Sequence, residues 1–169
     1  LACMDLGENK PYNGAITSLA SLGADNNANS LYGTLLSSNN IRTSKSCLDE
    51  MNKQIGTQNL KQGLDYELLT YARQLTENEF SVNPRLGYIS LNSSLNNDEI
   101  LAVAFEYTMN GKAYKVGEFA SEISSDRANS KVLMVKMLKG NIIRTRLPMW
   151  ELMMKNIYSL GSFNINAAD

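Results

Sequence analysis

The side chains in this sequence that could do chemistry are carboxylates, because the chain contains no histidine. That absence excludes imidazole acid–base catalysis, His-dependent triads and the usual zinc sites. The nearest carboxylate pairs are Asp98 with Glu99, Glu77 with Glu79, and Glu118 with Glu122. A glycosidase-type pair needs two carboxyl groups facing one cleft, whereas solvated charges are common in turns such as the one predicted at 95–99. We therefore expect no catalytic residues and no enzymatic activity.

Motifs for cofactors and redox chemistry are also missing from the sequence. It contains none of the patterns SxxK, GxSxG, GxxxxGK[ST], GxGxxG or CxxC. Cys3 and Cys47 are too far apart for a CxxC pair, so we expect two free thiols. In an oxidising compartment the alternative is a disulfide between them. No cofactor or metal is predicted.

One short loop is rich in oxygen ligands. Asp25 with Asn26, Asn27 and Asn29 could contact a calcium ion, but the glycine and terminal glutamate of an EF-hand are not there. The composition of residues 24–30 instead favours a solvated, mobile loop.

A stripe of large side chains near residue 150 is the main candidate for a binding surface. The residues that recur at helical spacing are Trp150, Met153, Met154, Ile157 and Tyr158. Pro148 fits the first turn of such a helix and Gly161 its end. The stripe predicts a C-terminal amphipathic helix whose apolar face either packs on the core or serves as an adaptable partner surface.

The elements that would position this helix are strands, and the clearest are at 100–119. Large apolar side chains alternate along residues 100–109, and Asn110-Gly111 then favours a two-residue type I′ turn. That turn fixes the register. It places Tyr107 opposite Tyr114, Phe105 opposite Val116, and Glu106 opposite Lys115.

Other elements follow from local patterns. We expect a helix over Ser44–Ile55, and strands over Tyr66–Tyr71, Phe80–Asn83, Leu86–Leu91 and Lys131–Lys139, the last with Leu133, Val135 and Met137 on one face. Residues 1–59 form a turn-rich region with short helices, and residues 60–169 form a β-rich domain that ends in the helix. The fold class is therefore α+β, an antiparallel sheet packed by the C-terminal helix and the short N-terminal helices.

Composition narrows the function classes. At 169 residues the chain is long enough to bury one substantial core. A net charge of −1 lacks the positive excess of a nucleic-acid-binding surface, and no apolar run is long enough to span a bilayer as a helix. We expect no nucleic-acid partner and no membrane-spanning segment in this chain.

Several segments closely resemble an internal part of the SprA/Sov family. They are Leu86–Asn92, Asp98–Tyr107, Asn110–Phe119 and Leu147–Leu160, with Gly63–Glu67 and Ala72–Leu75 upstream. Members of this family are very large cell-surface proteins of type IX secretion and gliding motility in Bacteroidetes. The resemblance implies a piece of an outer-membrane β-barrel translocon that passes folded cargo to the cell surface. It implies as partners the rest of the translocon chain, a plug protein and a PorV-like cargo shuttle, and it brings no catalytic residues.

The position of this piece within the translocon follows from its strands. They are short and carry Lys136 and Lys139, which does not fit a lipid-facing wall. We expect a water-soluble insert or cap domain in the cell envelope, periplasmic or extracellular, excised from a much larger protein. The alternative is a cell-surface β module that binds a glycan or a peptide.

Overall fold

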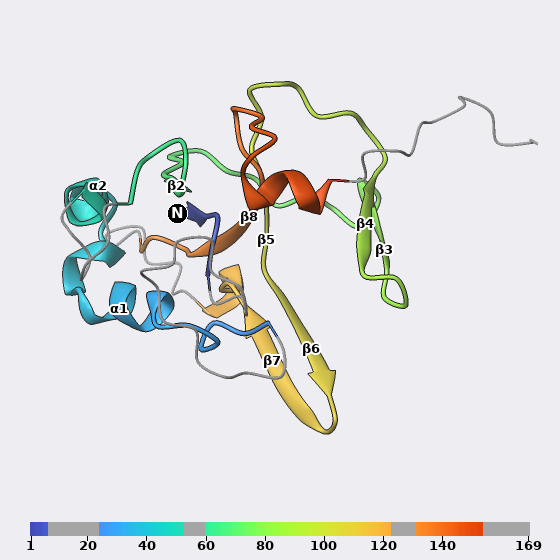
Figure 1. The fold of residues 1–169 in the computed structure, drawn as a ribbon, viewed down its shortest axis with the longest axis horizontal. Coiled ribbons are helices and arrows are strands. Elements are labelled where there is room, and N and C mark those ends of the chain that lie inside the picture. The colour runs from blue at the N-terminus through green and yellow to red at the C-terminus, as the bar shows by residue number, and fades with distance from the viewer. Residues whose placement is uncertain (7–23, 53–59, 123–130, 154–169) are drawn as a thin grey trace, which may run out of the picture.

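The computed structural model describes residues 1–6, 24–52, 60–122 and 131–153 (Figure 1). The α-helices are α1 (Leu31–Ser37) and α2 (Ser44–Asn52), and the 3₁₀ helices include η1 (Asn39–Arg42), η2 (Ala120–Glu122) and η4 (Pro148–Leu152). The strands are β1 (Ala2–Cys3), β2 (Tyr66–Glu67), β3 (Phe80–Asn83), β4 (Tyr88–Leu91), β5 (Leu101–Val103), β6 (Phe105–Met109), β7 (Lys112–Val116) and β8 (Val135–Lys139). The predicted α+β class is confirmed.

The central sheet has the strand order β2-β1-β8-β5. β1 runs antiparallel to β2 but parallel to β8, with Ala2 opposite Val135, and β8 runs antiparallel to β5. β8 was predicted to begin at Lys131 and β2 to extend to Tyr71, so both strands are shorter than expected. β3–β4 and β6–β7 form two separate two-stranded sheets (Figure 1).

Two buried clusters lie on opposite sides of β1. Leu1 and Cys3 belong to the larger cluster, while Ala2 and Met4 belong to the smaller one, as the alternation of side chains along a strand requires. The larger cluster also contains Leu6, Leu31, Leu35, Ile41, Cys47, Met51, Leu60, Tyr66, Val132 and Met134, and the smaller one Met137, Leu147 and Met149. The larger cluster thus draws on α1 and α2 as well as on the β-rich part of the chain.

The β6–β7 hairpin confirms the predicted register. Tyr107 lies opposite Tyr114, and their rings stack with centroids 5.2 Å apart. Asn110 and Gly111 both have positive φ, 53° and 77°, as a type I′ turn requires. The pairs of Phe105 with Val116 and of Glu106 with Lys115 are also as predicted.

The strand predicted over residues 100–109 is divided in two. Residues 101–103 pair with β8, and residues 105–109 pair with β7, with Ala104 between them. Gly117 crosses closely at this point, because a Cβ atom there would lie 3.0 Å from the Ala104 Cβ. The continuous alternation of apolar residues therefore serves two sheets rather than one.

The N-terminal helices agree with the prediction where the structure describes them. α2 begins at the predicted Ser44, and the Thr43 carbonyl accepts hydrogen bonds from the Ser46 and Cys47 amides at 3.1 and 2.8 Å. Cys47 and Met51 are buried in the larger cluster. The predicted end of this helix, at Ile55, lies outside the described residues.

The predicted C-terminal α-helix is wrong for the residues described. Residues 148–152 form the 3₁₀ helix η4, and Met153 is extended, with φ −86° and ψ 139°. Pro148 does start the helix, as predicted. The 3₁₀ turn buries Met149 in the cluster with Met137 of β8 while Leu152 stays exposed, so the packing of Met149 does not require an α-helix here. The rest of the predicted helix lies outside the described residues.

Candidate interaction surface

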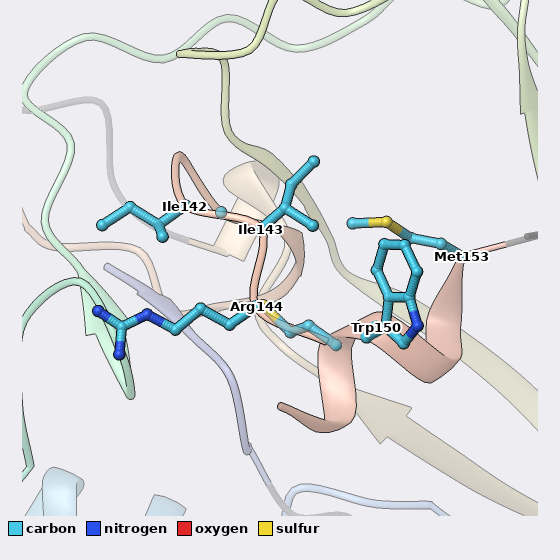
Figure 2. Close-up of a pocket in the computed structure, with 7 residues that line it drawn as sticks. Ile142, Ile143, Arg144, Trp150 and Met153 are labelled. Atoms are coloured by element: carbon cyan, nitrogen blue, oxygen red, sulfur yellow. The ribbon is translucent and has the colours of Figure 1, made fainter. Parts of the chain in front are cut away.

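The structure places two of the predicted site residues side by side. Trp150 and Met153, both half-buried, line the same pocket beside the turn that follows β8 (Figure 2). Met154, Ile157 and Tyr158, the other three, lie outside the described residues. The partner-surface interpretation of the stripe therefore rests on its first two members.

Buried side chains on either side hold this region in place. Leu147 and Met149 are 9% and 4% exposed and pack with Met137 of β8 in the smaller cluster. The Leu147 amide donates to the Arg144 carbonyl at 3.1 Å, and the Trp150 amide donates to the Leu147 carbonyl at 2.9 Å. The turn and η4 are thus fixed on the sheet.

Three aliphatic side chains in this region remain in solvent. Ile142, Ile143 and Leu152 are 47%, 52% and 49% exposed. Single exposed aliphatic residues are normal on a protein surface. Ile143 extends toward the side of the turn where Trp150 lies, whereas Ile142 extends to the side that Arg144 occupies (Figure 2). We call Ile142, Ile143, Trp150, Leu152 and Met153 the 142–153 surface.

A small pocket is hollowed into this surface. It has a volume of about 10 Å³, the lower limit for a single water molecule, and its lining includes Gly140, Ile143, Met149 and Trp150. Figure 2 shows the Met153 side chain extending toward Ile143, with the Trp150 ring beside both. The Arg144 side chain extends to the other side of the turn. The Trp150 ring and the Met153 thioether thus close over this space and leave little room between them.

Sequence reasoning missed Ile142, Ile143 and Arg144. They follow β8 directly and belong to no periodic pattern, so neither the strand nor the helix analysis includes them. The available signal was the aliphatic pair itself, set between Asn141 and Arg144 outside any predicted element.

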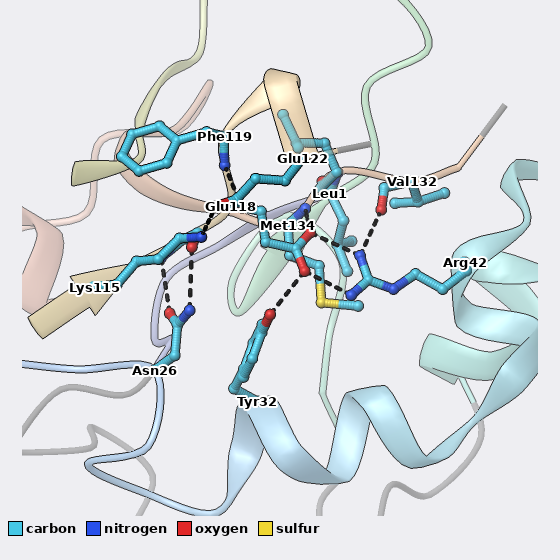
Figure 3. Close-up of polar contacts among 12 residues, drawn as sticks. Leu1, Asn26, Tyr32, Arg42, Lys115, Glu118, Phe119, Glu122, Val132 and Met134 are labelled. Carbon is cyan, nitrogen blue, oxygen red and sulfur yellow. Dashed lines mark hydrogen bonds and ion pairs between the residues drawn. The ribbon is translucent and has the colours of Figure 1, made fainter. Parts of the chain in front are cut away.

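The other notable polar site is the carboxylate of Glu118, which is 6% exposed (Figure 3). Arg42 donates to its two oxygens at 2.7 and 2.6 Å, a bidentate pair. The Tyr32 hydroxyl and the Met134 amide add hydrogen bonds at 2.8 and 2.9 Å. Four hydrogen bonds leave this carboxylate little capacity to accept a substrate proton.

The electrostatics of this site agree with a structural role. Burial alone raises the pKa of Glu118, but the hydrogen bonds from Arg42, Met134 and Tyr32 outweigh it and hold the pKa below the ordinary value. Burial, together with the Glu118 carboxylate, raises the pKa of Tyr32 to about 12. Glu118 therefore stays ionised and Tyr32 stays protonated at neutral pH.

Three of the other candidate carboxylates, Glu79, Glu99 and Glu122, make local contacts. Arg73 donates to Glu79 at 2.9 and 2.7 Å and, with Thr76, lowers the pKa of Glu79 to about 2. Glu99 accepts from the Asn96 amide at 2.7 Å. Glu122 pairs with Lys115. These contacts engage the carboxylates in turns and ion pairs.

The asparagine-rich loop is packed rather than solvated, so that prediction is wrong. Asn26 and Asn29 are 5% and 2% exposed. The Asn26 side chain bonds both the amide and the carbonyl of Gly117, at 2.8 and 3.1 Å, and Asn29 donates to both oxygens of Asp5 at 3.0 Å. Beside the end of β7, the loop thus makes hydrogen bonds of the kind that a neighbouring strand would make. Within the described ranges, no group of three or more His, Cys, Asp or Glu side chains converges as metal ligands.

Cys3 and Cys47 are both buried free thiols, the favoured of the two predictions. Burial raises the pKa of Cys3 to about 12 and also raises the pKa of Cys47. Thiols in this state are poor nucleophiles.

No protein-family profile matches the chain, and a search of curated proteins finds no significant match. Each helix in the described ranges is too short or too polar to cross a lipid bilayer.

Proposed function

We propose that this chain is a non-catalytic structural and interaction domain of an outer-membrane translocon of the SprA/Sov type, acting in type IX secretion and gliding motility. The observation that carries the proposal is the exposed apolar 142–153 surface. Its residues Trp150, Leu152 and Met153 fall within Leu147–Leu160, the segment with the most distinctive resemblance to that family. The domain lies in the cell envelope, on the periplasmic or extracellular side.

The chemistry of the surface supports an interaction role. Trp and Met are enriched at protein interfaces, and exposed aliphatic groups near them add apolar area that a partner can bury. Ile142 and Ile143 beside them are 47% and 52% exposed. The partners expected at this surface are the rest of the translocon chain, the plug protein or the PorV-like shuttle.

Site-specific photocrosslinking in the cell tests this function. A photoreactive residue at position 143 is expected to give an adduct with one of those three proteins, identified by mass spectrometry of the crosslinked peptide. The control position is Val82, which is 55% exposed on β3 and outside the surface. Adducts only with unrelated proteins, or the same adducts from both positions, would refute the proposal.

A second candidate function rests on β3–β4. An open groove of about 490 Å³ lies on this hairpin, lined by residues that include Asn83, Arg85 and Tyr88. Hydroxyl, amide and guanidinium groups beside an aromatic ring are the groups that bind a glycan or a polar peptide. A glycan array should then show binding that Tyr88→Ala removes and Tyr71→Ala, at a 93% exposed position, retains. An array without any bound glycan, with no peptide bound in a parallel screen, would remove this candidate.

A further inference from the structure

The ammonium group of Lys139, at the end of β8, lies among backbone carbonyl groups. It donates hydrogen bonds to the carbonyl oxygens of Asn96, Asn97 and Glu99 at 3.1, 3.1 and 2.5 Å. The carbonyl oxygen of Gly140 lies 3.4 Å away. An ammonium group has three donors and no acceptor, so the oxygens of one turn satisfy it completely. In the described ranges Lys139 forms no ion pair, and the cation is therefore held by peptide dipoles.

The pairing of β8 with β5 is irregular at this residue. Ala102 lies opposite Met137, but Leu101 lies opposite Lys139, so β8 contains one extra residue between these two pairs. Such a bulge bends the strand and changes the direction of nearby side chains. The bulge lies directly beside the lysine whose ammonium group reaches the turn.

The turn that supplies the carbonyl groups is closed by its own hydrogen bonds. The Glu99 amide donates to the Asn96 carbonyl at 3.2 Å, and the Glu99 carboxylate accepts from the Asn96 amide at 2.7 Å. This reciprocal pair is the arrangement of a helix capping box and fixes the turn. Converging carbonyl oxygens replace the hydration shell of a monovalent cation in channel filters. The 96–99 turn thus offers the oxygen set of a cation site.

The same turn lies in one of the two connections that join the β3–β4 hairpin to the central sheet. The strands of this hairpin form a separate sheet and do not pair with the central one. In the other connection, residues 68–75 make no backbone hydrogen bond with any part of the chain that the structure describes. The contact between Lys139 and the 96–99 turn is therefore a fixed point between the hairpin and β8.

We propose that the carbonyl groups of Asn96, Asn97, Glu99 and Gly140 form a site for a primary ammonium group, which Lys139 fills as an internal cation. By filling it, Lys139 holds the connection that carries the β3–β4 hairpin against the central sheet. A guanidinium group does not fit this role, because its donors spread in a plane and cannot all turn toward oxygens around one point. The inference does not depend on the proposed interaction function.

Chemical rescue of Lys139→Ala in the purified chain tests the inference. The substitution should lower the thermal midpoint by about 3–6 °C, because hydrogen bonds from a charged group are lost. Propylammonium chloride supplies the missing methylene chain and ammonium group, so it should raise the midpoint of this variant as its concentration increases. Tetramethylammonium chloride at equal ionic strength has no N–H donor and should not. The wild type should show no such rise, because its site is filled.

Two further variants separate the site from a general effect of charge. Lys139→Arg keeps the positive charge but should still lower the midpoint, and propylammonium should not rescue it because the arginine side chain occupies the approach. Lys45→Ala removes an exposed lysine of α2 and should change neither the midpoint nor the response to propylammonium. Hydrogen exchange followed by mass spectrometry should be faster over residues 92–100 in Lys139→Ala and slow again with propylammonium.

Four results would overturn the inference: a wild-type midpoint in Lys139→Arg, no rescue of Lys139→Ala, equal rescue by both salts, or unchanged exchange over residues 92–100. None of them bears on the interaction function, because crosslinking from position 143 concerns a different surface. A failure of the crosslinking experiment would likewise leave the ammonium site in place.

Discussion

The Glu118 carboxylate joins segments that are far apart in the sequence. Tyr32 and Arg42, which bind it, are 86 and 76 residues away, and Met134 is 16 residues away. A bidentate pair with a partly buried arginine is worth more than an exposed ion pair, because solvent screens it less. The N-terminal helices are held to β7 and β8 partly through this one side chain.

Glu118→Gln is expected to lower the free energy of unfolding by about 2–3 kcal/mol. The substitution removes the charge and turns an amide donor toward the donors of Arg42. Urea unfolding measures the loss. Glu106→Gln, on the exposed face of β6, is the control and should change stability by less than about 0.5 kcal/mol. Equal effects of the two substitutions would contradict the role given to Glu118.

The pH dependence of the same variant has a defined sign. Because the folded protein holds the pKa of Glu118 below its ordinary value of 4.5, the stability it contributes is complete above that value and is lost as the pH falls through the folded pKa. The difference between wild type and Glu118→Gln should therefore close in acid. A difference that stays constant from about pH 7 to about pH 3 would argue against an ionised Glu118.

Secondary-structure elements that are determined by residues close together in the sequence were predictable. The register of β6–β7 follows from Asn110-Gly111 alone, because a two-residue turn leaves one pairing. The break at Ala104 was not predictable, since it depends on Gly117 crossing from another strand. The stripe at Trp150 likewise fits an α-helix by spacing, yet a 3₁₀ turn satisfies the packing of Met149.

The same limit applies to the polar sites. Asparagine side chains are typical of solvated turns, so the composition of residues 24–30 gave no sign that Asn26 pairs with Gly117, 91 residues away. The stripe located Trp150 and Met153, but the turn that brings Ile142 and Arg144 beside them has no periodicity. Contacts that depend on tertiary packing leave no local pattern.

Alanine substitutions at three glycines should change the free energy of unfolding by different amounts. Gly111→Ala should destabilise the hairpin by about 1 kcal/mol, because alanine disfavours its φ of 77°. Gly117→Ala should cost more, above about 2 kcal/mol, since it adds contacts of 3.0 and 3.2 Å with Ala104 to a φ of 78°. Gly33→Ala in α1, where a Cβ meets nothing within 4 Å, should stabilise by about 0.5–1 kcal/mol. Thermal denaturation ranks the three, and any other order would contradict this account.

At the scale of the molecule, the two buried clusters share β1 and the segment that contains β8. Alternate residues of β1 face opposite clusters, so neither cluster can open without exposing the other. The described part of the chain should therefore unfold as one cooperative unit.

Two probes test this cooperativity. The single tryptophan, Trp150, lies beside the smaller cluster, whereas far-UV circular dichroism reports largely on α1 and α2. Both signals should show the same midpoint in urea. Leu6, in the larger cluster, is 0% exposed. Leu6→Ala should therefore lower the free energy of unfolding by about 2–4 kcal/mol and shift both midpoints to lower urea together. If Leu6→Ala left the midpoint of the Trp150 signal unchanged, the two clusters would be independently unfolding units.

The parallel pairing of β1 with β8 also sets an order of events during synthesis. Met4 and Lys136, which contact each other across this pair, are 132 residues apart. At about 10 residues per second, a ribosome needs roughly 13 s to make that stretch. During this interval β1 has no β8 to pair with. Its apolar residues can then bind chaperones or form non-native strand pairs. The central sheet is thus completed only once the β8 segment is available to pair with β1, whether the chain folds on the ribosome or after export to the cell envelope.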